Sequence, residues 1–325
     1  MQTAPAPRHT TFGALFDALL GNVEHVIQGK REPVRLALVC LFAEGHLLIE
    51  DVPGVGKTSM AKALARSIDG TWSRIQFTPD LLPSDVTGVS VWNRVANEFE
   101  FRPGGVFADV VLADEINRAS PKTQSALLES MEEHQVTVDS RTYALPRPFL
   151  VIATQNPVEL EGTFALPEAQ LDRFLVRVVL GYPQEADERA IARRYRATDE
   201  PLEAVRAVMD PAALPGIRDM TRQVVVSAEV EAYLVRIVRA TRAHADLQLG
   251  ASPRASVALY RAAQASALLE GRDFVLPDDV SALAEPVLTH RLVVDVDREL
   301  RGATAGDVIG EVLDGVSVGV GTGAR

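Results

Sequence analysis

Residues 45–62 read GHLLIEDVPGVGKTSMAK, in which a short apolar stretch runs into a glycine-rich turn and then into residues that favour a helix. A strand, a turn and a helix in this order are typical of a phosphate-binding loop. Gly54 and Gly56 would let backbone N–H groups approach an anion, because glycine has no Cβ in the way. A helix that begins near Lys57 would point its positive end at the same anion.

Lys57 and Thr58 add the side chains that such a loop needs. The lysine ammonium can reach the β- and γ-phosphates of a nucleotide, and the threonine hydroxyl can hold Mg²⁺. One residue departs from the full pattern, which has glycine five positions before Gly56, where this chain has Asp51. A chance glycine turn before a surface helix is the alternative, and the residues downstream argue against it.

Two acids follow an apolar run at residues 110–115, which read VVLADE. Four consecutive apolar residues fit a buried strand of a parallel sheet. Asp114 and Glu115 would then lie at the carboxyl edge of that sheet, where open α/β folds bind ligands. The first acid of such a pair helps to hold Mg²⁺, and the second can orient and deprotonate an attacking water.

A third apolar run, FLVIAT at residues 149–154, ends at Gln155, Asn156 and Pro157. Asn-Pro alone is an ordinary turn signal. Beside the first two motifs, however, the Asn156 amide could hydrogen-bond the γ-phosphate or the attacking water. We therefore expect Asn156 to belong to the same site.

An α/β scaffold must position these side chains. From Phe12 to about Tyr182 strand-like runs alternate with helical stretches, which predicts a parallel sheet with helices on both faces. The predicted helices of this part are 12–28, 32–44, 58–68 and 123–133.

The rest of the chain reads as helical. Strand signals fade from Pro183 onward, and helical patterns cover 185–196, 228–243 and 253–270 before another helix starts at Pro277. We expect a flexible tail at 1–11, an α/β core at 12–183 and a small all-helical domain at 184–325 whose glycine-rich end is frayed.

Composition excludes several classes of protein. In the 325 residues the 47% hydrophobic content predicts a globular protein with a sizeable core, and the net charge of −11 disfavours broad binding of nucleic acid or anionic membranes. Cys40 is the single cysteine, so a disulfide framework or a cysteine-ligated zinc site has no support. No apolar run is long enough to span a membrane, and the first ten residues lack an apolar signal core, so we expect a cytoplasmic protein.

With these motifs in this order, the chain resembles a MoxR-type AAA+ ATPase of the AAA_3 family and the helix-2-insert clade. The residues that carry the resemblance are EDVPGVGKT (50–58), ADEINRA (113–119), ATQNP (153–157), EGTFALPEAQLDRF (161–174) and GASPRA (250–255). It covers the chain from about Phe12 to the end of the helical region, which would be the lid of the AAA+ core.

The resemblance implies a role for each matching residue. Lys57 and Thr58 match Walker A, Asp114 and Glu115 match Walker B, and Asn156 matches sensor 1. Arg254 matches the sensor 2 arginine, which the lid would bring onto the nucleotide. The full set of residues expected around ATP is Ile27, Gly29, Pro53, Gly54, Val55, Gly56, Lys57, Thr58, Ser59, Asn156 and Arg254, where Ile27 and Gly29 would lie near adenine.

Arg173 matches the arginine finger, which reaches the nucleotide of a neighbouring subunit. A guanidinium supplied in this way stabilises the charge that spreads over the transferring phosphoryl group. Arg173 could instead pair with Asp172 or Glu168, and Arg118 or Arg177 could be the residue that acts in trans.

Two insertions also match the family. Residues 79–105 contain two strand-like runs and resemble the helix-2 insert. Residues 133–148 read as a hairpin around Asp139 and Ser140, and they resemble the pre-sensor 1 hairpin. Such loops face the pore or the substrate in ring ATPases; a plain surface hairpin is the alternative.

The resemblance implies Mg²⁺-dependent ATP hydrolysis by a homo-oligomeric ring, which would be a hexamer as in the family. It would remodel a protein client during assembly, activation or metal-cofactor insertion, and the client could be a von Willebrand factor A-domain protein. The alternatives are a magnesium-chelatase-like motor subunit and a nucleic-acid-directed motor. For the latter only Arg141 and Tyr143 are suggestive.

Overall fold

The computed structural model describes residues 9–52, 54–156, 162–194 and 201–319. Its centre is a five-stranded parallel sheet in the order β2–β5–β8–β1–β9. The strands are β1 (Leu47–Glu50), β2 (Trp72–Gln76), β5 (Val110–Asp114), β8 (Leu150–Gln155) and β9 (Val176–Val178). Because all five are parallel, their carboxyl ends meet at one edge of the sheet, as the sequence predicts.

The sheet separates two apolar cores, because successive side chains of a strand point to opposite faces. Leu47 and Ile49 of β1 belong to one core, and Leu48 between them belongs to the other. The first core takes in helices α1 (His9–Val26), α2 (Arg31–Phe42) and α3 (Lys57–Ser67). The second takes in α5 (Pro121–Glu133). Helices thus cover both faces, which confirms the predicted α/β class.

Most predicted elements appear with small shifts at their ends. α1 begins at His9, so residues 9–11 are helical rather than part of the expected tail. The remaining predicted tail and the last six residues of the chain lie outside the described residues. β2 and β9 are absent from the prediction, as are the short elements α4 (Pro83–Thr87), η1 (Ile116–Arg118) and α6 (Glu168–Leu171).

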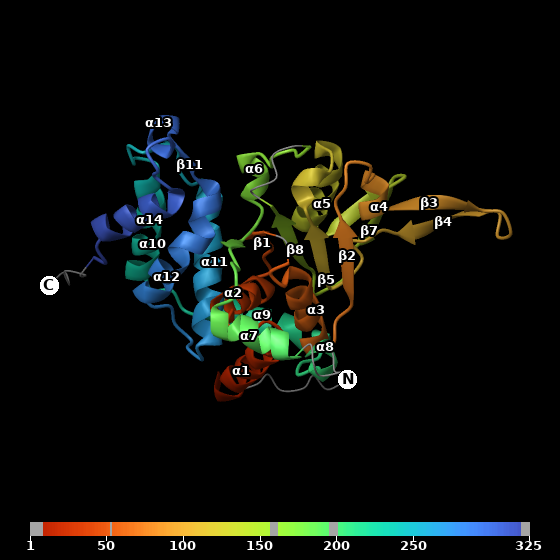
Figure 1. Cartoon of the computed structure of the whole chain (residues 1–325), viewed down its shortest axis with the longest axis horizontal. Coiled ribbons are helices and arrows are strands. Elements are labelled where there is room, and N and C mark those ends of the chain that lie inside the picture. The colour runs from red at the N-terminus through yellow and green to blue at the C-terminus, as the bar shows by residue number, and fades with distance from the viewer. Residues whose placement is uncertain (1–8, 53, 157–161, 195–200, 320–325) are drawn as a thin grey trace.

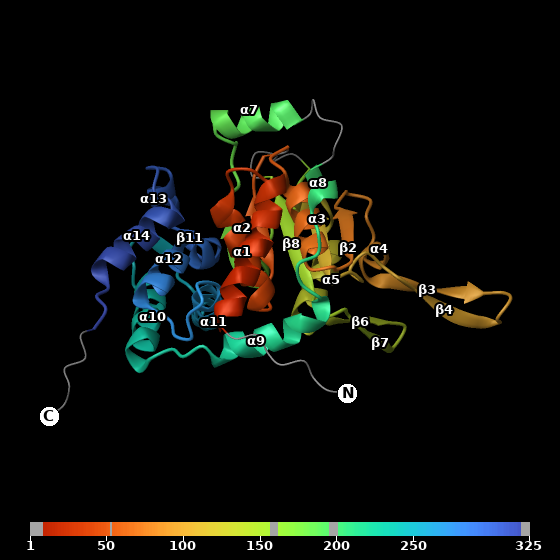
Figure 2. The same cartoon turned by 90° about the horizontal axis from the view of Figure 1, so that it is seen from below.

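Both predicted insertions are antiparallel hairpins. β3 (Gly88–Asn93) and β4 (Glu98–Pro103) project far from the body of the molecule, and β6 (Gln135–Val138) and β7 (Arg141–Ala144) lie nearby (Figures 1 and 2). Within the first hairpin, Trp92 packs edge-on against Phe99 at 5.1 Å between centroids. The ring of Phe101 connects the two hairpins, since it stacks on Tyr143 at 3.8 Å.

After β9 the chain first returns to the core. Helix α7 (Glu185–Arg194) lies beyond the carboxyl edge of the sheet, and α8 (Pro201–Ala204) packs against α1 and α3. Val208 donates its backbone N–H to the Ser67 carbonyl at 2.9 Å, and Asn22 donates to the Arg206 carbonyl at 2.7 Å. Residues 201–208 therefore pack on the core although they follow the predicted domain boundary.

The lid lies beside the core (Figure 1). Its helices are α9 (Leu214–Gln223), α10 (Ala228–Thr241), α11 (Pro253–Leu269), α12 (Pro277–Leu288), α13 (Val296–Glu299) and α14 (Ala305–Gly315), with the turns η2 (Pro211–Ala213) and η3 (Thr289–Arg291). It also holds a two-stranded sheet of β10 (Leu247–Leu249) and β11 (Val293–Val294), which the prediction lacks. None of the helices described has both the length and the apolar character to cross a bilayer.

The lid and the core share one apolar core, since the buried residues of α11 and α12 are continuous with those of α1 and α2. Two lid arginines also bind the carboxyl end of α2. Arg218 donates to the Leu41 carbonyl at 3.1 Å and pairs with Glu44 at 3.1 Å, and Arg261 donates to the Ala43 carbonyl. Arginines are favourable there because the last carbonyls of a helix are unpaired and carry partial negative charge.

A buried histidine makes the stability of this fold depend on pH. His46 Nδ1 accepts the Val151 N–H at 3.0 Å and Nε2 lies 3.2 Å from the Met131 carbonyl, so the ring is neutral with its proton on Nε2. Burial lowers the pKa of His46 to about 3. Below about pH 6.5 the His46 ring is protonated in the unfolded chain but stays neutral in the folded chain. His46 therefore lowers the free energy of unfolding by about 1.4 kcal/mol per pH unit as pH falls toward 3.

Urea unfolding at about pH 7.5 and about pH 5.5 should therefore show a loss of stability at the lower pH that is smaller in His46→Asn by about 1.4 kcal/mol. A His25→Asn variant, which changes an exposed histidine of α1, is the control. Equal pH dependence in the wild type and His46→Asn would show that His46 is not responsible.

Candidate nucleotide-binding and hydrolysis site

The phosphate-binding loop has the backbone that its sequence predicts. It connects β1 to α3, and Gly54 and Gly56 take φ angles of +86° and +96°. Gly56 is the N-cap that precedes the first residue of α3, so the free N–H groups of the first helical turn face the loop. Lys57 is 9% exposed and donates from Nζ to the Asp51 carbonyl at 2.9 Å, across the loop.

Asp51, the departure from the P-loop pattern, braces this loop. Its Oδ2 accepts the Gly181 N–H at 2.6 Å, and its Oδ1 accepts the Val52 N–H at 2.8 Å. Gly181 follows β9, so the carboxylate ties the start of the loop to the chain that leads toward α7. A glycine at this position could not make either bond.

The two predicted Walker B acids meet the end of β8. Asp114 Oδ1 accepts the Thr154 hydroxyl at 2.6 Å, and the Glu115 N–H donates to the same hydroxyl at 2.9 Å. Glu115 has a left-handed backbone with φ of +57°, which ends the strand at this point. Asn156 is two residues beyond Thr154 and is 6% exposed. The structure therefore brings Asp114, Glu115 and Asn156 together at the carboxyl edge.

Two residues of this cluster, Arg74 and Gln76, lie on β2, a strand that the sequence patterns do not predict. Arg74 Nη2 lies 2.6 Å from Asp114 Oδ2, and Gln76 Nε2 donates to Glu115 Oε2 at 2.9 Å. Only Ile75 of this strand is buried, so its apolar pattern is too weak to reveal it. The signal that could have found it is the alternation of the apolar Ile75 and Phe77 with the polar Arg74 and Gln76.

The charges at this edge suit a phosphate and a divalent cation. Burial lowers the pKa of Lys57, while Asp114, Asp51 and Glu115 act in the opposite direction. These charge effects show that the ammonium and the acids lie close to one another. Hydroxyl and carboxylate oxygens are the donors that Mg²⁺ prefers, so Thr58 and Asp114 fit the ligand set expected for it.

The segment expected near adenine lies beside the loop. A Cβ on Gly56 would come within 3.0 Å of Ile27 Cδ1, so Ile27 packs against the glycine turn. Gly29 has φ of +70°, and a Cβ there would overlap the Asp187 carboxylate of α7. Lys30 donates to the Tyr182 carbonyl at 2.9 Å. The segment that comes close to the Gly29 backbone in this structure is therefore α7. The contact of Ile27 and Gly29 with adenine stays a prediction.

The other residues predicted to contact the nucleotide are Val55, Thr58, Ser59 and Pro53. Val55 packs against the first apolar core, and Thr58 and Ser59 are partly exposed in the first turn of α3. Pro53 lies outside the described residues.

Arg173 and Arg254 lie at the opposite edge of the sheet. Leu175, two residues after Arg173, donates its N–H to the carbonyl of His46, which precedes β1. Both guanidinium groups bind Glu132, which follows Met131, the residue that contacts the His46 ring. A four-residue strand spans roughly 13 Å. In this structure Arg254 therefore lies away from the P-loop of its own chain, and its contact with a nucleotide stays a prediction.

The two alternatives to Arg173 are engaged beside the P-loop of their own chain. Arg118 Nη1 lies 3.0 Å from Glu115 Oε2, and Arg177 Nη1 lies 2.8 Å from Glu50 Oε2, the residue before Asp51. Of the three, only Arg173 lies away from this chain's own phosphate-binding loop. The alternative that Arg173 pairs with Asp172 or Glu168 named the wrong partner, since its guanidinium pairs with Glu132.

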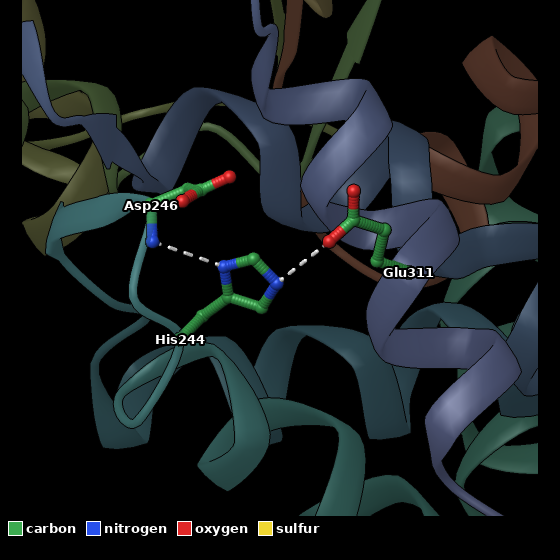
Figure 3. Close-up of side chains that lie close together, drawn as sticks. All are labelled: His244, Asp246 and Glu311. Atoms are coloured by element: carbon green, nitrogen blue, oxygen red, sulfur yellow. Dashed lines mark hydrogen bonds and ion pairs between the residues drawn. The ribbon is translucent and has the colours of Figure 1, made fainter. Parts of the chain in front are cut away.

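A second cluster of metal-type ligands lies in the lid, where His244, Asp246 and Glu311 converge (Figure 3). The Asp246 N–H lies 3.3 Å from His244 Nδ1, which makes that nitrogen the acceptor and leaves the proton on Nε2, 3.2 Å from Glu311 Oε2. Asp246 also pairs with Arg298 at 2.9 Å. A metal would have to displace both that proton and that arginine, so we interpret the cluster as a tie between α14 and the loop after α10.

Together these features define a class. A glycine-rich loop between a strand and a helix, two acids and an asparagine on neighbouring strands, and a helical lid are those of a P-loop ATPase of the AAA+ type. The matching family models agree: "ATPase family associated with various cellular activities (AAA)" matches residues 46–176, and "AAA lid domain" matches residues 239–312.

Similar proteins identify the family more closely. The chain is 50% identical to YeaC of Bacillus subtilis (strain 168), over 93% of this chain and 95% of that protein. It is 42% identical to Chaperone MoxR1 of Mycobacterium tuberculosis, over 95% of this chain and 82% of that protein. A crystal structure of a Cytophaga hutchinsonii protein superposes with a TM-score of 0.89 at 38% identity, covering 95% and 96% of the two chains. The chain belongs to the MoxR-type AAA+ ATPases.

Asp51 offers a test of how the P-loop is held. Asp51→Gly restores the common P-loop residue but removes the acceptor for two backbone N–H groups. We expect a loss of about 1.5–3 kcal/mol in the free energy of unfolding, the usual value of hydrogen bonds to a charged group. Asp51→Asn keeps one acceptor oxygen and should lose less. Urea unfolding measures both, and a stabilised Asp51→Gly variant would contradict the bracing role.

Proposed function

We propose that this ATPase works as a homo-oligomeric ring in which each ATP site is shared between two chains. The observation that carries this proposal is the separation of the two halves of the site. Lys57, Asp114 and Glu115 lie at the carboxyl edge of the sheet, whereas Arg173 and Arg254 lie at the amino edge. The arginines of one chain are then available to the phosphates of the next. A hexamer is the ring size that we propose from the family.

Each residue has a distinct part in the proposed reaction. Lys57 and the N–H groups of the first turn of α3 bind the phosphates. Glu115 takes a proton from the attacking water, which Asn156 orients. Mg²⁺ held by Thr58 and Asp114 would neutralise charge on the phosphate oxygens. Arg173 of the neighbouring chain, with Arg254 beside it, stabilises the charge that develops on the γ-phosphoryl group.

We further propose that the ring acts as a chaperone-like remodeller of a protein client in the cytoplasm, where ATP is available. The name of the Mycobacterium tuberculosis relative supports a chaperone. A client in assembly, activation or metal-cofactor insertion, and a von Willebrand factor A-domain protein in particular, are proposals from the family resemblance. The exposed rings of Trp92 and Phe99 on the projecting hairpin favour an apolar protein segment as the contact.

A nucleic-acid-directed motor is less well supported. That alternative rests on Arg141 and Tyr143, and the Tyr143 ring is already stacked on Phe101 with 12° between the planes. One face of the Tyr143 ring is therefore already covered by a protein side chain, which leaves less of it to stack on a base.

The first test is steady-state ATPase activity across a series of protein concentrations with Mg²⁺. Specific activity should rise with concentration, because a site is complete only when two chains meet. Glu115→Gln should bind ATP and assemble but lose hydrolysis, since an amide cannot accept the proton. Normal turnover in Glu115→Gln would exclude Glu115 as the base, and constant specific activity in a monomeric protein would exclude the shared site.

A mixing experiment tests the arginine finger. Arg173→Ala alone and Lys57→Ala alone should be nearly inactive. Their mixture should recover part of the activity, because a Lys57→Ala chain can offer its intact Arg173 to the intact P-loop of an Arg173→Ala chain. Co-assembly is checked by size-exclusion chromatography of the mixture. No recovery in rings that contain both variants would rule out the trans role of Arg173.

A further inference from the structure

Glu132 is the one carboxylate that binds both arginines at the amino edge, among the residues that the structure describes. It is the second-last residue of α5. Its Oε2 lies 3.1 Å from Arg173 Nη2, and its Oε1 accepts Arg254 Nη2 at 2.9 Å. Each oxygen thus serves one guanidinium group. The two arginines come from the core and the lid, so this carboxylate joins the two parts of the molecule.

The backbone that carries Arg173 is held separately, by the lid. Asp172 Oδ1 lies 2.7 Å from Nε of the buried Arg291, and Asp172 Oδ2 accepts the hydroxyl of Ser252 at 3.0 Å. Ser252 also caps α11, whose first turn contains Arg254. The contacts of Asp172 therefore fix the backbone next to Arg173, and Glu132 sets the direction of the Arg173 guanidinium group.

The corner carries more positive than negative charge. Its linked side chains are three arginines, at 173, 254 and 291, against the two carboxylates of Asp172 and Glu132. Nε of Arg173 is also buried without a hydrogen-bond partner. Arg254 lies at the positive end of α11, where a cation is unfavourable without an anion nearby. The phosphates of the same chain would bind at the other edge of the sheet.

We infer that Glu132 is a positioning residue for hydrolysis in the neighbouring subunit. Resting on the proposed function, this inference adds that Glu132 holds Arg173 and Arg254 side by side before the neighbour's nucleotide arrives. Long arginine side chains lose rotamer freedom when they bind, so a pair that is already ordered reaches the productive geometry more often. A carboxylate and a phosphate accept from guanidinium in the same way, so the phosphate can take the place of Glu132.

The variants Glu132→Ala and Glu132→Gln test this inference, with Glu133→Ala as the matched control. Glu133 is the next residue of α5, is exposed, and carries the same charge. We expect Glu132→Ala to lower kcat by about 10-fold or more, because the arginines lose their alignment. KM for ATP should not rise, since the phosphate-binding edge is intact. Glu132→Gln should be intermediate, and Glu133→Ala should match the wild type.

Mixing shows in which chain the defect acts. Because Glu132 acts through the arginines of its own chain on the neighbour's nucleotide, Glu132→Ala mixed with Lys57→Ala should recover activity. Damage to the folding of the Glu132→Ala chain would not be repaired by a neighbour. A chain that carries Glu132→Ala together with Arg173→Ala and Arg254→Ala should be no slower than a chain that carries only the two arginine substitutions, because Glu132 acts through these two arginines. If Glu132→Ala does not fold or assemble, the same mixture is made with Glu132→Gln.

The inference is overturned if Glu132→Ala and Glu132→Gln turn over ATP as fast as Glu133→Ala. It is also overturned if they are slow but are not rescued in rings that contain Lys57→Ala. These results are distinct from failure of the proposed function, in which the wild type itself shows no concentration-dependent ATPase activity and Arg173→Ala is not rescued either.

Discussion

The direction of the five parallel strands decides the rest of this structure. Because every strand runs the same way, the carboxyl edge collects the ends of β1, β5 and β8, and with them the lysine, the acids and the asparagine of the site. The same direction places the residues before β9 at the other edge. A single sheet thereby separates phosphate binding from the arginines by the length of a strand, and no side chain is long enough to cross it.

The lid is fastened to this sheet by contacts of two kinds. Apolar side chains of α11 and α12 share a core with α1 and α2, and such burial has little directional preference. Charged contacts add direction: Arg218 binds the end of α2, and Arg291 binds Asp172 from a buried position. A buried pair loses much of its value when its geometry changes, so these contacts favour one orientation of the lid over others.

Local sequence patterns predict the parts of the site that are local. The P-loop, the strand ends at Asp114 and Asn156, and both hairpins follow from apolar runs and turn residues within a few positions of one another. β2 is not predicted because a half-exposed edge strand carries mostly polar residues, and the roles of Arg74 and Gln76 are therefore not predicted either. The pairing of Glu132 with Arg254 joins residues 122 positions apart, and no periodicity in the sequence encodes such a contact.

The Glu132 corner and the P-loop are different surfaces of one chain, so the proposed assembly joins unlike patches. Such head-to-tail contacts close into a ring only when the rotation between copies allows it, and otherwise they continue as an open row. An open row leaves one P-loop without arginines at one end and one arginine pair without a nucleotide at the other. A closed ring leaves neither. Turnover per chain would therefore reveal whether the assembly has closed, and the difference would be largest for the shortest rows.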